Sequence, residues 1–226
     1  GSGFNIAMKD LEIRGAGDIL GGEQSGFIND IGFDAYQKIL AEAVDELKEN
    51  EFKDLYEELE GHHEKVFVKE TQIDADFELL FPDDYINNIT ERLNLYTALN
   101  LIKDEVGLKK FETELVDRFG ELPIEAEDLL NSVRIKWIAN AIGLEKIIMK
   151  QGKMIGYFIA DQQSAFYQSS TFTRVMQFVQ SRPNLCKIKE KQTRNGLRLI
   201  LVFEHIKSID KAYLALSPFE VKKEKI

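Results

Sequence analysis

The sequence predicts an α+β fold in which a helical hairpin element, residues 1–61, precedes a domain of mostly antiparallel strands and several helices, residues 62–226. Two observations carry this prediction. The first part combines glycine-rich turns with helical periodicity, and the second combines helical patterns with two hairpin signals. With 226 residues, the chain is long enough for one or two domains with buried cores.

The first 61 residues begin with a glycine-rich segment, in which six glycines fall between residues 15 and 32. Glycine adopts backbone conformations that other residues resist, so this many glycines predict short helical pieces joined by tight turns. A cleaner helix is expected over about residues 34–47, where apolar side chains recur at i, i+3 and i+4. A second, short helix is expected near residues 52–59, and Gly61 would end it.

Residues 62–142 have a different pattern of apolar and polar residues, which predicts one strand followed by three helices. Residues 73–79 alternate between apolar and polar side chains, which indicates a strand buried on one side; residues 65–68 alternate more weakly. Helices are expected near residues 84–101, 108–119 and 125–142. Pro123 suits the first turn of the last of these helices, and Gly143 would close it.

The remaining residues predict two hairpins, each followed by a helix. Strand-like runs over 144–150 and 154–160 are joined by a Gln-Gly-Lys turn, and runs over 185–192 and 197–203 by a turn containing Asn195-Gly196. Helices are expected over residues 166–180 and 206–215.

The charge of the chain is strongly divided along the sequence. Its formal net charge is −10, with 5 basic and 15 acidic residues in 1–61, 7 and 17 in 62–130, and 17 and 7 in 131–226. A non-specific nucleic-acid binder would carry net positive charge, so that class is disfavoured for the chain as a whole. The single cysteine fits a reducing cytosol, and no apolar run reaches the length of a membrane span.

No self-sufficient active site or metal site is expected. The glycines of residues 15–21 lack the preceding strand and the long following helix of a dinucleotide-binding loop. Adjacent histidines in His62-His63-Glu64 would point to different sides, which disfavours a shared metal ion. The acidic pairs Asp74/Asp76 and Asp83-Asp84 are interpreted as surface charges. The sequence also has no phosphate loop, no Gly-x-Ser-x-Gly motif and no cysteine paired with a plausible base.

Arg14 and Gln24 are the candidate functional side chains, because glycine-defined turns would hold both. A guanidinium and an amide in fixed positions could contact phosphate or relay a conformational change. From the residues alone, ordinary surface hydrogen bonding is the favoured interpretation.

Residues 4–26 closely resemble the translocation motif that follows the motor in RecG-type helicases and in bacterial transcription-repair coupling factors. Residues 31–36, 80–86, 92–93 and 114–123 resemble the coupling factors rather than RecG, and the last three segments belong to that family's C-terminal regulatory domain. The candidate translocation-coupling residues are Asp10, Glu12, Arg14, Gly15, Gly17, Gln24, Ser25 and Gly26.

The resemblance implies that the whole protein is an ATP-driven double-stranded DNA translocase in the bacterial cytoplasm. It would displace stalled RNA polymerase and recruit the excision-repair protein UvrA. Arg14 and Gln24 would couple closure of the motor lobes to movement along DNA. The C-terminal domain would dock on the protein's own UvrA-binding module and mask it. ATP and Mg²⁺ would bind in motor domains that precede residue 1, so neither cofactor is expected in this chain.

Three alternatives stay open from the sequence. A RecG-like helicase tail is one, although the long α+β domain argues against it. A protein-interaction domain without a motor is the second. A small-molecule enzyme is the third, and no residues that would serve it are found.

Overall fold

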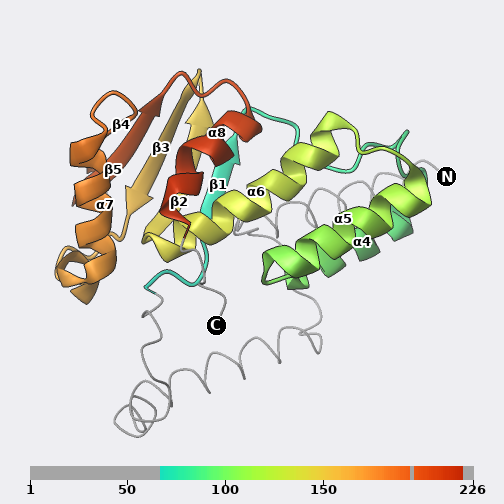
Figure 1. The fold of residues 1–226 in the computed structure, drawn as a ribbon, viewed down its shortest axis with the longest axis horizontal. Helices are drawn as coiled ribbons and strands as arrows, with labels where there is room; N and C mark the ends of the chain where they lie inside the picture. Colours follow the sequence, from blue (N-terminus) through green and yellow to red (C-terminus); the bar gives the residue numbers. More distant parts are fainter. Residues whose placement is uncertain (1–66, 194–195, 221–226) are drawn as a thin grey trace, which may run out of the picture. The chain divides into compact units, whose positions relative to one another are not determined.

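The computed structural model describes residues 67–193 and 196–220, which form a five-stranded sheet and five α-helices (Figure 1). The strand order is β1-β2-β3-β5-β4. Only the β1–β2 pair is parallel, and the other three pairs are antiparallel. The predicted α+β class with mostly antiparallel strands is therefore confirmed.

The elements follow one another from the first strand to the C-terminal helix. The strands are β1 Gln72–Ala75, β2 Leu144–Lys150, β3 Lys153–Phe158, β4 Cys186–Thr193 and β5 Gly196–Glu204; the α-helices are α4 Ile89–Leu101, α5 Glu105–Phe119, α6 Ile124–Ala141, α7 Ser170–Ser181 and α8 Ile209–Leu216; the 3₁₀ turns are η1 Ala165–Gln168 and η2 Ser217–Phe219.

Capping side chains set the helix starts, which lie later than the apolar periodicity predicts in three places. The helix expected from residue 84 begins at Ile89, because the Asn88 side chain accepts hydrogen bonds from the first-turn backbone N–H groups. The helix expected over 166–180 is divided into η1 and α7, since Ser169 ends the first and caps the second. Ser208 caps α8 in the same way.

The first strand is shorter than its alternating pattern predicts. It ends at Ala75, which pairs with Met149, whereas the alternation continues to residue 79. The partner strand β2 ends one residue after Met149, so the chain beyond residue 76 has no neighbour with which to pair. Leu79 is nevertheless buried, and it packs in the core without being in a strand.

The two hairpins form as predicted. The β2–β3 turn has Gln151 at φ 53° and Gly152 at φ 72°, the positive values that two-residue hairpin turns require. Strands β4 and β5 pair from Cys186↔Phe203 to Thr193↔Gly196. The Asn195 of the predicted turn lies outside the described residues.

One core lies between the sheet and the helices. Side chains of β2, β3 and β5 that face the helices, among them Ile147, Phe158 and Leu201, join the buried faces of the helices in this core. In Figure 1, α6 and α8 lie in front of the strands, and they contact each other extensively. Gly143 connects α6 to β2 at φ 78°, where a Cβ would meet the Phe166 ring at 2.3 Å.

Candidate docking surface

The residues predicted to couple ATP hydrolysis to translocation cannot be located in the structure. Asp10, Glu12, Arg14, Gly15, Gly17, Gln24, Ser25 and Gly26 all lie outside the described residues. The structural part of the candidate function is therefore built from the C-terminal domain alone.

The three C-terminal segments that carry the family resemblance meet at one junction. The Tyr85 hydroxyl donates a hydrogen bond to the carbonyl oxygen of Gly120 at 3.1 Å, and its ring packs edge-on against Phe119. Burial raises the pKa of Tyr85. The residue before Phe119, Arg118, forms an ion pair with Glu91 of α4 and lies over the Phe119 ring. Segments 80–86 and 114–123 are thus joined directly to each other and to α4.

The buried side chain of Arg92 contributes further contacts to the same junction. Its guanidinium is buried, donates to the carbonyl oxygen of Ile86 and forms an ion pair with Asp83 at 3.1 Å. One helical turn later, the Tyr96 hydroxyl accepts a hydrogen bond from the backbone N–H of Phe81 at 2.9 Å. A buried cation needs such partners because its desolvation is costly. Arg92 and Tyr96 therefore help to hold these segments together.

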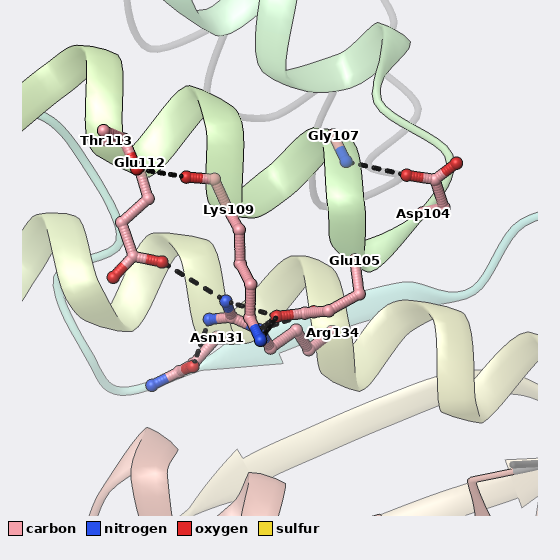
Figure 2. A network of polar contacts seen from close by, with 8 residues as sticks. All are labelled: Asp104, Glu105, Gly107, Lys109, Glu112, Thr113, Asn131 and Arg134. Carbon is pink, nitrogen blue, oxygen red and sulfur yellow. Dashed lines mark hydrogen bonds and ion pairs between the residues drawn. The ribbon is translucent and has the colours of Figure 1, made fainter.

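A second polar network ties α5 to α6 (Figure 2). Arg134 of α6 donates from Nε and Nη2 to the Glu105 carboxylate at 2.9 Å and from Nη1 to Asn131 at 2.9 Å, and Glu112 lies 3.4 Å away. Burial disfavours the charged guanidinium, but the hydrogen bonds and charges of Glu105 and Glu112 outweigh it and raise the pKa of Arg134. The network fixes the position of α5.

The start of α5 is fixed as well. Asp104 caps the helix by accepting a hydrogen bond from the Gly107 N–H at 2.7 Å, as Figure 2 shows. Asp104 thus holds the first turn of α5, and Arg134 holds its flank at Glu105 and Glu112, so the exposed surface of the helix has a defined orientation.

The outer face of α5 has the mixed character of a protein contact surface. Val106 is 80% exposed and Val116 is 40% exposed, so α5 carries two aliphatic side chains in contact with solvent. A shallow hollow on the helix is lined by Lys109, Glu112, Thr113, Val116 and Asp117. Exposed aliphatic groups among charges can support non-covalent contact with a partner.

The described part of the chain offers little support for metal binding or thiol chemistry. No group of three histidine, cysteine or acidic side chains there is placed to hold a metal ion. Cys186 is buried, and burial raises the pKa of its thiol to about 11, which disfavours the reactive thiolate. None of the helices in residues 67–193 and 196–220 combines the length and the apolar character that a transmembrane helix needs.

Sequence reasoning missed Arg134 as the residue that positions α5. The only signal was an isolated arginine within the apolar run of α6, at a helix position flanked by buried Val133 and Ile135. Such a residue predicts a buried partner but does not identify it, because Glu105 lies 29 positions away in the sequence.

Comparisons with known proteins relate the chain to one family. Residues 75–169 match the TRCF domain. The transcription-repair-coupling factor of Staphylococcus haemolyticus is 33% identical over 210 residues, which cover 89% of this chain and 17% of that protein. The Escherichia coli protein of the same name is 39% identical over 147 residues, 65% of this chain and 12% of that protein.

A solved structure supports the fold. A crystal structure described as the C-terminal domain of a transcription-repair coupling factor has a TM-score of 0.50 and 17% identity, covering 69% of this chain and 96% of that one. The chain thus spans less than a fifth of the length of the two relatives above.

Proposed function

The chain carries the C-terminal TRCF-domain region of a transcription-repair coupling factor, and from this premise we propose that it is part of an ATP-dependent double-stranded DNA translocase that displaces stalled RNA polymerase. The observation that carries the proposal is the match to the staphylococcal relative over 89% of the chain. A match of this length includes part of residues 1–61 as well as the TRCF domain. ATP and Mg²⁺ would be bound by motor domains outside this chain, in the bacterial cytoplasm.

In this proposal the two parts of the chain have different tasks. Residues 1–61 couple ATP-driven closure of the motor lobes to movement along DNA through Arg14 and Gln24. A coupling element transmits motion only if its contacts differ between two states of the motor. The arginine fork and the glutamine amide are suited to exchange hydrogen-bond partners between such states.

The C-terminal domain masks the UvrA-binding module of the same protein. The network around Arg134 and the junction at Tyr85 support this task, because they hold α5 rigidly with its outer face open. A partner that docks on a pre-ordered surface loses little conformational entropy. A latch of this kind needs a coupling free energy of only about 1–3 kcal/mol.

The TRCF-domain match disfavours a RecG-like helicase tail, the first alternative, because that tail has no need of the domain over residues 75–169. An interaction domain without a motor remains a second candidate. It is distinguished by the behaviour of the full-length protein in a polymerase-displacement assay.

The experiment is an Arg14→Ala substitution in the full-length protein. We expect ATP hydrolysis to continue while displacement of a stalled RNA polymerase is lost, because chemistry and movement become uncoupled. Lys9→Ala is the matched control, since it removes a nearby cation that is not among the proposed coupling residues. Unimpaired displacement by Arg14→Ala would refute the coupling role.

A further inference from the structure

The sheet has a second face that faces away from the core (Figure 1). Alternation along the strands places Tyr157, Ile200 and Val202 there, together with the partly buried Ile148 and Ile155. These five side chains form an apolar cluster that consists only of strand residues. In the described part of the chain, no helix contributes to it. We call this surface the outer sheet face.

Basic side chains surround the apolar cluster. The register pairs Lys187 with Val202, Lys189 with Ile200 and Lys191 with Arg198, so the three lysines of β4 share the face of the cluster. Lys146 of β2 pairs with Tyr157 and lies on the same face. Successive lysines along β4 are two positions apart, a spacing of about 6.6–6.8 Å.

Much of this positive charge is not neutralised nearby. Lys146, Lys187 and Lys189 have no ion-pair partner among the described residues. Elsewhere on the outer sheet face the lysines are paired, Lys150 with Asp74 at 2.9 Å and Lys153 with Glu204 at 3.3 Å. The unpaired charge is therefore concentrated on the β4 side of the cluster and on β2.

Lys191 and Arg198 are held in place on this face. Lys191 Nζ donates a hydrogen bond to the Tyr157 hydroxyl at 2.7 Å, and both cations lie over the Tyr157 ring. Arg198 also donates to the Glu145 carboxylate, while its buried Nε has no hydrogen-bond partner among the described residues. Both cations are thus held in fixed positions, and the charge of Arg198 already has Glu145 as its acidic partner.

Protection of an edge strand accounts for only part of this arrangement. Lysines on β4 hinder edge-to-edge pairing with other sheets, a common role for edge charges. Lys146, however, lies on β2, which has neighbours on both sides, and it has no ion-pair partner among the described residues. Its charge does not protect an edge, so a ligand for this face explains it better.

We propose that the outer sheet face binds an acidic, amphipathic segment of a partner protein. Carboxylates of the segment would contact Lys187, Lys189 and Lys146, and its apolar side chains would cover Ile148 and Ile155. Charge complementarity would orient the segment, and burial of the aliphatic side chains would add affinity. This surface is separate from the α5 face and the inference goes beyond the proposed masking role.

A nucleic acid fits the same face less well. Binding of single strands relies on aromatic rings that stack on bases, but Tyr157 is only 7% exposed and its ring is already covered by two cations. The aliphatic side chains at the centre would gain nothing from contact with phosphates. An acidic amphipathic polypeptide uses the unpaired lysines and the partly buried Ile148 and Ile155, while Ile200 and Val202 are already buried.

The test is a fluorescence-anisotropy titration of the full 226-residue chain with a labelled peptide of alternating glutamate and leucine. The comparison probes are the same peptide with serine in place of leucine and a labelled DNA duplex. Lys187→Glu/Lys189→Glu is the test variant. Lys207→Glu/Lys211→Glu, which changes two exposed lysines at the start of α8 by the same total charge, is the control.

We expect the Glu-Leu peptide to bind the unaltered chain and the test variant to bind it about tenfold more weakly. The control should bind almost as the unaltered chain does, and the serine peptide should bind more weakly than the leucine peptide. Absence of peptide binding, an equal loss in the control, or tighter binding of the duplex would overturn the proposal. If the double variant does not fold, as judged by its circular dichroism, Lys146→Glu provides the same test.

Discussion

The guanidinium of Arg134 and the carboxylate of Glu105 form a two-point ion pair that fastens α6 to the first turn of α5, with Nε and Nη2 each 2.9 Å from a carboxylate oxygen. The arginine side chain is 13% exposed and the glutamate 44%, so the pair lies between a surface and a buried salt bridge. Its loss would leave a largely desolvated cation without its main partner.

Glu105→Ala should therefore lower the free energy of unfolding by about 1–2 kcal/mol, because Arg134 keeps its burial but loses its principal acceptor. The control is Glu114→Ala, which removes an exposed i,i+4 contact to Lys110 at 4.0 Å and should cost less than about 0.5 kcal/mol. Urea denaturation of both variants measures the difference. Equal losses would show that the network does not hold α5.

Gly143→Ala should be far more destabilising than Gly152→Ala. Both glycines have a similar positive φ, 78° and 72°, so both substitutions introduce comparable backbone strain of about 1 kcal/mol. Only at Gly143 would the new Cβ overlap the Phe166 ring, whereas nothing lies within 4 Å at Gly152. A total loss of about 3 kcal/mol is expected at Gly143, because overpacking adds to the strain.

Thermal or chemical unfolding of the two glycine variants measures this difference. Losses that agree within error would mean that the Phe166 ring moves aside without cost. In that case the packing between the end of α6 and η1 would be looser than the structure indicates.

The stability of the domain should fall at alkaline pH in a window set by Cys186. Burial raises the pKa of its thiol from 9.0 to about 11. Because the folded-state pKa is the higher one, the contribution is fully present below pH 9 and is lost as the pH rises toward about 11. Tyr85, Tyr167 and Tyr213, whose pKa values burial also raises, add to the decline at the upper end.

Cys186→Ala should therefore make the decline of unfolding free energy with pH shallower between pH 9 and 11. Val175→Ala is the control, because it shortens a buried aliphatic side chain without removing a titratable group. It should lower stability at every pH and leave the slope unchanged. An unaltered slope in Cys186→Ala would show that the thiol does not titrate differently on unfolding.

Local features of the fold were predictable because they depend on neighbouring residues. The strand over 144–150 and the turn at Gln151-Gly152 agree with the structure, since the alternation and the turn glycine are local signals. The extent of β1 was overestimated because alternation does not reveal where a partner strand ends. The parallel pairing of β1 with β2 was not predicted, as it joins residues more than 70 positions apart.

The candidate docking surface was predictable only in part. The resemblance identified segments 80–86 and 114–123, but it did not indicate that Tyr85 and Gly120 are joined by a hydrogen bond. The Arg134–Glu105 pair and the basic outer sheet face depend on tertiary contacts and strand register, which no local pattern contains. The role of Arg14 and Gln24 stays a prediction, because those residues lie outside the described part of the chain.

The masking role is tested most directly by the affinity of the full-length protein for UvrA, measured with and without residues 62–226. The deletion is paired with Val116→Lys/Asp117→Lys, which alters the exposed face of α5 while leaving the domain in place. Asp210→Lys on α8 is the control for added positive charge. We expect the deletion and the α5 variant both to bind UvrA about tenfold or more tightly than the unaltered protein does, and the control to bind it no more tightly. Equal UvrA affinity with and without residues 62–226 would contradict it.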